Sequence, residues 1–245
     1  MAALEAIDRR IADRKAGYVC VADGVILDMS HRDREYLKVI EGAMFSICDS
    51  SYVPMYIRAI HGRKYRQYTG SEIFRDIISK RRYRMAFLGG PQEILDGLRQ
   101  NLTAWNEDVS EMLFMELPYC DVEDFDYEGI AKSVSDDGAD LIWVSLGAPK
   151  QEKFMHRLLP HLDRGVMIAV GAAFKFFSGL DEKRAPDWMI RNHMEFLHRI
   201  VQDPRKQIRR CSKILRTLPA ILTAEIKRPR SATPTKKNRG NETSD

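Results

Sequence analysis

Short apolar runs alternate along the chain with longer segments in which apolar residues recur at helical spacing. The longer segments predict helices, and the runs predict strands at 18–21, 44–48, 84–88, 111–117, 141–146 and 166–170. Residues 141–146 are almost continuously apolar and rich in branched and aromatic side chains, which is typical of a central parallel strand covered on both faces. Strands alternating with helices predict an α/β fold with a Rossmann-like, doubly wound and mostly parallel sheet.

The pattern becomes all-helical near the C-terminus. Apolar residues at helical spacing over 187–202 are typical of core packing. Over 208–222 an apolar face lies opposite Arg209, Lys213 and their basic neighbours, which predicts a basic amphipathic helix suited to a bilayer interface. Packing of this helix on the domain or on a neighbouring subunit is the alternative.

Charge is distributed unevenly along the chain. From Arg205 onward twelve basic residues face three acidic ones, a balance of +9, whereas residues 1–204 carry 27 basic and 32 acidic groups. The positive end favours a polyanionic partner, either an acidic lipid surface or a nucleic acid. We therefore divide the chain into a Rossmann-like domain (1–186), a helical basic appendage (187–228) and a disordered tail (229–245).

Cysteine spacing and hydropathy indicate the compartment. The four cysteines lie far apart without CxxC pairing, so they predict neither a zinc site nor a disulfide framework and fit a reducing cytosol. Residues 1–17 have charges spread through them and lack the apolar core of a signal peptide. The weakly polar stretch 166–177 is too short to span a bilayer. We expect a cytoplasmic protein that is not integral to the membrane.

Two strand ends carry signals for anion binding. Gly147 to Pro149 stop the strand at 141–146, and Lys150 and Gln151 open a helix whose first N–H groups have no partner within the helix. Such a terminus favours phosphate, to which Lys150 adds a charge and Gln151 an amide, although a plain strand-to-helix turn is equally compatible. Gly89 and Gly90 let a backbone approach a ligand closely, but their spacing matches neither the P-loop nor GxGxxG.

Carboxylates follow two other strands. Asp23 and Asp49 end the strands at 18–21 and 44–48, on the rim where an acid or base would be useful. Capping of the next helix is the alternative, which we favour for Asp23 and leave open for Asp49. Ser71 is predicted to cap the helix at 72–80. The DxD formed by residues 124–126 is interpreted as the start of a helix rather than as a cation site.

Taken together, seven segments resemble the WecG/TagA/CpsF glycosyltransferases, glycosyltransferase family 26. The resemblance covers roughly residues 17–210, and the combination of GAPKQE with RAPxWM and DPxK is its specific part. The segments are CDSSYVP at 48–54, YTGSEIF at 68–74, FLGGPQE at 87–93, LGAPKQEKF at 146–154, GAAFKFFSG at 171–179, KRAPDWM at 183–189 and MEFLHRIVQDPRK at 194–206.

The resemblance implies inverting, metal-independent transfer of an N-acetylmannosamine-type sugar in bacterial surface polysaccharide biosynthesis, with no cofactor. The donor would be a UDP-sugar, and the acceptor N-acetylglucosamine on undecaprenyl diphosphate. The appendage would bind an anionic membrane surface through residues 205–228, peripherally on the inner face of the plasma membrane, and subunits would assemble as a homo-oligomer. Some members of the family use other donors, such as UDP-glucose.

The resemblance also assigns roles to residues. Asp49 matches the proposed base, which takes the proton from the acceptor hydroxyl. Gln151 matches a residue of the donor pocket. Arg199, Lys206 and Arg209 match basic residues that lie over the site and neutralise a diphosphate, with Lys206 standing where the family usually has Arg.

Several positions depart from the family pattern. Residues 21–23 replace Thr-Pro-Asn, Gln67 replaces an Arg, Ser50 replaces a Gly and Lys175 replaces an Asp. Because these positions would touch the sugar or the diphosphate, Asp23 and Lys175 are candidate substrate contacts. A different donor, or a nucleotide-sugar-binding homologue without activity, stays open. Nucleic-acid binding through the tail rests on charge alone, and we do not expect it.

Overall fold

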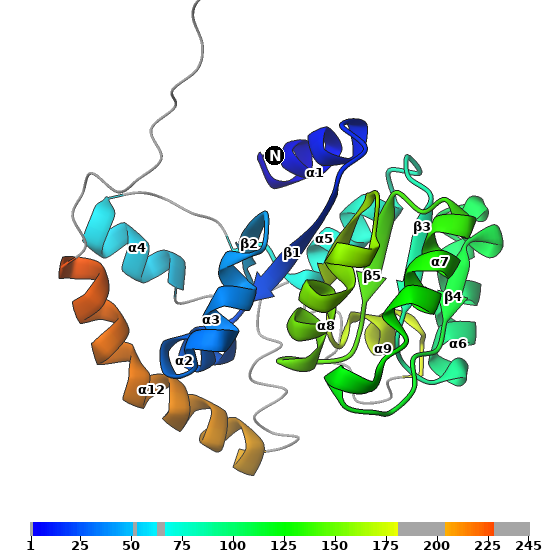
Figure 1. The fold of residues 1–245 in the computed structure, drawn as a ribbon. Coiled ribbons are helices and arrows are strands. Elements are labelled where there is room, and N and C mark those ends of the chain that lie inside the picture. Colours follow the sequence, from blue (N-terminus) through cyan, green and yellow to red (C-terminus); the bar gives the residue numbers. More distant parts are fainter. Residues whose placement is uncertain (1, 51–52, 63–66, 181–203, 228–245) are drawn as a thin grey trace, which may run out of the picture.

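The computed structural model describes residues 2–50, 53–62, 67–180 and 204–227, without the side chains of 205–211, 213–215 and 224. Its centre is a six-stranded sheet in the order β2-β1-β6-β5-β3-β4, and every neighbouring pair is parallel. The predicted Rossmann-like parallel sheet is therefore confirmed (Figure 1). The strands are β1 Ala16–Ala22, β2 Phe45–Cys48, β3 Met85–Leu88, β4 Leu113–Met115, β5 Leu141–Val144 and β6 Gly165–Ala169.

Helices cover both faces of this sheet, and each face has its own apolar cluster. One face packs against α1 (Ala2–Ala12), α5 (Gly70–Ile78), α6 (Gln92–Thr103) and α9 (Ala173–Phe177). The other packs against α3 (Arg34–Glu41), α7 (Tyr127–Asp137) and α8 (Lys150–Leu158). The central strands are buried on both sides because their side chains alternate between the two clusters. Short 3-10 helices occupy Glu107–Glu111, Val122–Asp124 and Leu159–His161.

Three further helices lie beside the β1–β2 end of the sheet (Figure 1). They are α2 (Gly24–Arg32), α4 (Val53–His61) and the long α12 (Pro204–Lys227). Thr217 of α12 is buried; its Oγ1 donates to Asp28 of α2 and accepts from Arg32 Nη2 at 3.1 Å. His61 Nε2 of α4 lies 2.8 Å from Glu225 Oε1 of α12. These contacts hold α12 against the domain.

Helix caps differ in places from the sequence prediction. The predicted N-cap Ser71 is wrong, because Thr69 caps α5 in a capping box with Glu72. The segment between β1 and β2 forms two helices, since Asp33 ends α2 and its side chain caps α3. The interpretation of the DxD is confirmed at Asp126, whose side chain accepts from Gly129 N at 2.9 Å and caps α7.

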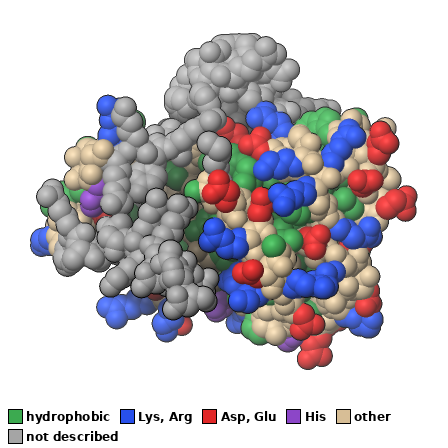
Figure 2. Space-filling view, turned by 90° about the horizontal axis from the view of Figure 1, so that it is seen from above, with side chains coloured by type: hydrophobic (Ala, Val, Ile, Leu, Met, Phe, Trp, Pro, Cys, Tyr) green, Lys and Arg blue, Asp and Glu red, His purple; other side chains and the backbone are tan. Residues whose placement is uncertain are grey.

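The C-terminal expectations are only partly covered by the described residues. The predicted amphipathic helix lies within α12, and Pro219 is inside that helix. The stripe at 187–202 and the tail at 229–245 lie outside the described residues. No helix in the described ranges is long and apolar enough to cross a membrane. On the face drawn in Figure 2 the described basic and acidic side chains are interspersed, so those residues form no continuous basic patch there.

Gly89 fixes the approach of β3 to the loop after β5. Its φ is +103°, and a Cβ added there would lie 2.6 Å from the backbone oxygen of Ser145. We expect Gly89→Ala to lower the free energy of unfolding by about 3 kcal/mol or more, because strain and overlap with rigid backbone add. Gly138→Ala is the control: its φ is +77° but its Cβ would meet only the end of Arg164 at 3.2 Å, so it should cost about 1–2 kcal/mol. Equal losses in urea unfolding would contradict the close-approach argument.

Thr217 should be the main polar anchor of α12. We expect Thr217→Val to weaken the docking of α12 by about 1–3 kcal/mol, because the buried Asp28 carboxylate loses a donor. Hydrogen exchange of the α12 amides in the full chain measures this as faster exchange. Thr223→Val is the matched control, since the exposed Thr223 hydroxyl donates to Pro219 O of its own helix at 2.7 Å. Equal exchange in both variants would contradict the anchor.

Candidate active site

Ligands of open α/β sheets bind where neighbouring strands send their next helices to opposite faces. The strands β3 and β5 are neighbours, but α6 and α8 after them lie on opposite faces of the sheet. The same reversal separates β5 from β6, because α9 after β6 lies on the face opposite to α8. Because all strands are parallel, the loops after β1, β3, β5 and β6 meet on one rim. This rim is the candidate site.

The turn between β5 and α8 lies at the centre of the rim. Ser145 Oγ donates to Gly171 O at 2.6 Å and thereby joins this turn to the loop after β6. On its other side Gly89 touches the backbone of Ser145. Gly147 has a φ of +76°, and its N–H donates to Gln151 Oε1 at 3.1 Å. The turn is therefore fixed by contacts with two neighbouring loops and with the first turn of α8.

Gln151 is buried at the start of α8. Its Nε2 donates to Glu152 Oε1 at 2.8 Å, while its Oε1 accepts from Gly147. A Cβ added at Gly171 would lie 3.7 Å from Gln151 Oε1 and 3.9 Å from Nε2. The amide therefore lies next to Gly171, in the loop after β6. An amide nitrogen carries two N–H groups, and the second makes no hydrogen bond to any residue that the structure describes.

Lys150 holds a neighbouring loop. Its Nζ donates to Cys120 O and lies 5.0 Å from the centroid of the Phe125 ring and 5.4 Å from that of Tyr119. The ammonium is thereby tied to the segment after β4 through a carbonyl and two aromatic faces. The ammonium charge lies near the N-terminus of α8, but its hydrogen bond goes to a carbonyl of the protein. Tyr119 itself is fully exposed.

The two predicted carboxylates lie on the same rim as this turn. Asp23 caps α2, since its Oδ1 accepts from Val25 N at 2.8 Å and Ile26 N at 3.0 Å. Asp49 directly follows β2, is half-buried, and its N–H donates to Ala22 O at 2.9 Å. Asp49 ends a strand two positions from β6, where Gly171 and the Gln151 amide lie. Two interstrand spacings amount to about 10 Å, which is within the reach of a sugar diphosphate but too long for a direct contact.

The other predicted substrate contacts are at least partly exposed, or they have no side chain that the structure describes. Gly90 is partly exposed at the end of β3 with a φ of +80°, and Lys175 is exposed on α9. Arg199 lies outside the described residues. Lys206 and Arg209 belong to the first turns of α12, but the structure does not describe their side chains. Their proposed place over the site therefore stays a prediction.

Sequence reasoning missed the role of Glu152. It is fully buried, and its Oε2 accepts from Tyr36 Oη of α3 at 3.2 Å. Burial raises the pKa of this carboxyl and the charge of Asp23 adds to the effect, although hydrogen bonds from Gln151 and Tyr36 oppose it. Burial, followed by the charge of Glu152, raises the pKa of Tyr36 and of Cys20. The signal was available: Glu152 precedes Met155 by three residues and so falls on the apolar face of α8.

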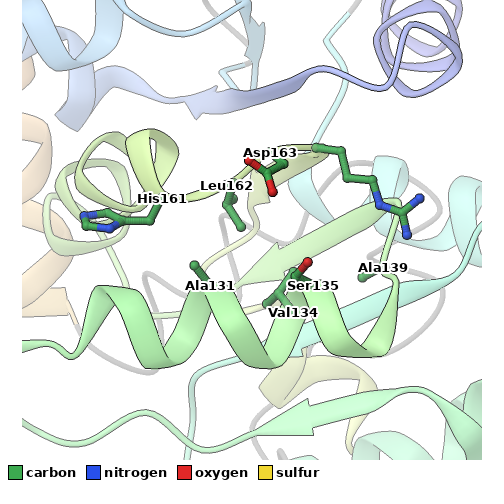
Figure 3. Close-up of a pocket in the computed structure, with 8 residues that line it drawn as sticks. Ala131, Val134, Ser135, Ala139, His161, Leu162 and Asp163 are labelled. Atoms are coloured by element: carbon green, nitrogen blue, oxygen red, sulfur yellow. The ribbon is translucent and has the colours of Figure 1, made fainter.

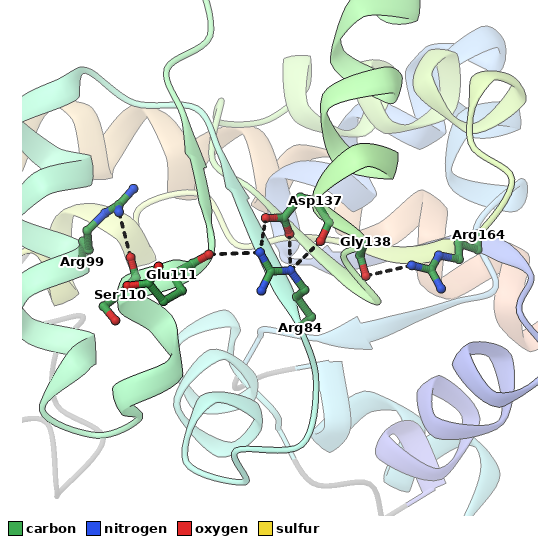
Figure 4. A network of polar contacts seen from close by, with 7 residues as sticks. All are labelled: Arg84, Arg99, Ser110, Glu111, Asp137, Gly138 and Arg164. Atoms are coloured by element: carbon green, nitrogen blue, oxygen red, sulfur yellow. Dashed lines mark hydrogen bonds and ion pairs between the residues drawn. The ribbon is translucent and has the colours of Figure 1, made fainter.

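At the opposite rim of the sheet, where the strands begin, polar contacts hold the elements together. Arg84, just before β3, bonds to the Asp137 carboxylate at 2.6 and 3.0 Å and to Glu111 O at 3.0 Å (Figure 4). A small pocket on this side is lined by α7 and by the residues before β6, including His161 and Arg164 (Figure 3). Since it lies at the amino ends of the strands, it is remote from the loops that frame the candidate site.

The fold and the rim define the class of the protein. A six-stranded parallel sheet with helices on both faces is a Rossmann-like architecture. The model of the glycosyl transferase WecG/TagA/CpsF family matches residues 1–231, and the chain belongs to this family. It is therefore a glycosyltransferase of the hexosyl-transferring type.

Relatives support this assignment. An N-acetylglucosaminyldiphosphoundecaprenol N-acetyl-beta-D-mannosaminyltransferase of Bacillus subtilis (strain 168) is 26% identical over 205 residues, which cover 82% of this chain and 78% of the relative. A protein of the same name from Bacillus spizizenii is 23% identical, with 89% and 82% covered. One from Staphylococcus aureus (strain MW2) is 24% identical, with 76% and 72% covered.

The buried carboxyl of Glu152 should make stability depend on pH. Because its pKa in the folded chain lies above the ordinary 4.5, its stabilising effect is complete below that value and is lost as pH rises through the folded pKa. Gln cannot ionise, so the melting temperature of Glu152→Gln minus that of the wild type should grow more positive from pH 4.5 to pH 8. Glu128→Gln, at an exposed position of α7, is the control. A difference at Glu152 that stays constant with pH would contradict this account.

Proposed function

We propose that this chain transfers an N-acetylmannosamine-type sugar from a UDP-sugar to N-acetylglucosamine on undecaprenyl diphosphate, with inversion, in bacterial surface polysaccharide biosynthesis. The observation that carries the proposal is the common rim: the turn before α8 and Asp49 lie on the same edge of the sheet, after β5 and β2, with β6 and β1 between those strands. The names of the relatives support the acceptor. The alternative is that the chain uses another donor found in the family, such as UDP-glucose.

The donor diphosphate would bind at the turn between β5 and α8. Two features favour an anion there: the dipole of α8 and the second N–H of the Gln151 amide. Gly90 and Gly171, on either side, are partly exposed and carry no side chain. Lys150 adds positive charge nearby, and it would have to leave Cys120 O to touch the ligand directly.

Asp49 would be the general base. Its carboxylate takes the proton from the acceptor hydroxyl while that oxygen bonds to the anomeric carbon. The bond from that carbon to the UDP oxygen breaks on the opposite face, so the configuration inverts and UDP leaves. We expect no metal in this step: Arg199, Lys206 and Arg209 would neutralise the diphosphate, and Lys175 and Asp23 would contact the donor.

The acceptor is carried by a lipid, so the site must work at a membrane surface. The chain has a basic C-terminal end, and α12 is docked beside the β1–β2 end of the sheet. We propose that residues 205–228 bind anionic lipid peripherally on the inner face of the plasma membrane. A homo-oligomer of this chain would place several such helices on one surface.

Asp49→Asn should abolish most of the transfer. With a panel of UDP-sugars, a short-chain lipid-diphosphate acceptor and EDTA, we expect UDP release by the wild type. We expect a roughly 10²- to 10⁴-fold lower kcat in the variant, because an amide cannot accept the proton.

Asp126→Asn is the control, since Asn replaces Asp as a helix cap and its activity should be kept. Intact turnover by Asp49→Asn would show that the base lies elsewhere. UDP binding by the wild type without transfer to any acceptor would favour a nucleotide-binding homologue, and activity restored only by a divalent cation would contradict metal-independent action.

A further inference from the structure

Glu152 is costly to bury, and the transfer chemistry proposed above does not use it. Its carboxylate is fully buried between α8 and α3, where it accepts from Gln151 Nε2 and from Tyr36 Oη. Burying an ionisable group is unfavourable even with donors from Gln151, Tyr36 and its own backbone N–H, and an apolar side chain of the same length would fill the space at lower cost. The carboxylate must therefore provide something other than packing.

What it provides is a direction for the Gln151 amide. An amide has chemically different ends, and a half-turn about its last bond exchanges the oxygen with the NH₂ group. Glu152 Oε1 accepts from Gln151, so it selects the NH₂ group, and the Gly147 N–H only donates, so it selects the oxygen. Between these two partners the amide has a single favourable orientation.

This orientation has two consequences at the rim. The Gly147 turn is closed from the side of α8, because its N–H is held by Gln151 Oε1. The second N–H of Gln151 Nε2 remains next to Gly171, where a Cβ would lie 3.9 Å from that nitrogen. A donor kept in place before the ligand arrives costs no reorganisation when an anion binds.

We propose that Glu152 is a positioning residue of the donor site: by fixing the Gln151 amide it presents one N–H to a diphosphate oxygen of the nucleotide. This inference rests on the proposed function, since it takes the ligand to be a nucleoside diphosphate. Tyr36 occupies the other carboxylate oxygen and belongs to α3, so it supports Glu152 without touching the turn.

Three variants of the full chain test the proposal. Glu152→Met keeps the length of the side chain but accepts no strong hydrogen bond, so the Gln151 amide loses its fixed direction. Glu152→Gln is the conservative variant, because its oxygen accepts from Gln151 Nε2 while its NH₂ donates to the Tyr36 hydroxyl. Tyr36→Phe is the matched control, since it removes a hydrogen bond from the same carboxylate on the side away from the turn.

Binding of UDP, followed by calorimetry, is the first readout. We expect Glu152→Met to bind UDP roughly 10-fold more weakly or worse, the loss of one hydrogen bond to a charged group. Glu152→Gln and Tyr36→Phe should stay within about 2-fold of the wild type. Unchanged UDP affinity in Glu152→Met would overturn the proposal, whatever happens to its melting temperature, because a purely structural role predicts that result.

Exchange of the Gly147 amide hydrogen, measured without ligand, is the second readout. It should be faster by roughly 10-fold in Glu152→Met and unchanged in Tyr36→Phe, because only the first variant releases the amide that accepts from Gly147. Unchanged exchange in Glu152→Met would overturn the clamp itself. Faster exchange in a chain whose wild type binds no UDP would instead contradict the proposed function, so the two failures are distinguishable.

Discussion

The parallel alignment of all six strands is the constraint on which the rest of the structure depends. It brings the loops after β1, β3, β5 and β6 to one rim, although Asp23 and Gly171 are far apart in the sequence. Because α6 and α9 lie on the face opposite to α8, the loops after β3, β5 and β6 diverge. A helix N-terminus, glycine turns and two carboxylates then share an edge that no single segment could form.

Polar groups beneath that edge determine how rigid it is. Ser145, Gln151 and Glu152 exchange hydrogen bonds with the backbone of two loops and with Tyr36 of α3. Inside a protein such bonds are strong, and the partners left by the removal of one member are expensive to leave unpaired. The network therefore gives the rim a defined geometry but lowers the stability of the fold. The raised pKa of Glu152 reflects the cost of burying its carboxylate.

Much of this architecture was predictable from the sequence. The apolar runs gave the strands, and the residues after them gave the rim, because strand ends in a parallel sheet are fixed by topology. The sequence could not indicate that Lys150 binds Cys120 O and two rings, or that Thr69 rather than Ser71 caps α5, since such choices depend on tertiary neighbours. Glu152 was overlooked because an acidic residue in the first turn of a helix is usually explained by the helix dipole.

The position of α12 follows from the same rim. The helix α2 begins at Asp23, at the end of β1, and holds Thr217 of α12 through Asp28 and Arg32. A nine-residue helix is about 13 Å long and resists bending, so it sets a nearly fixed distance between α12 and the strand ends. If α12 lies on a lipid surface, the rim stays at a nearly fixed distance from that surface. A lipid-linked acceptor, whose diphosphate also stays at the surface, then meets Asp49 by diffusing in two dimensions rather than three.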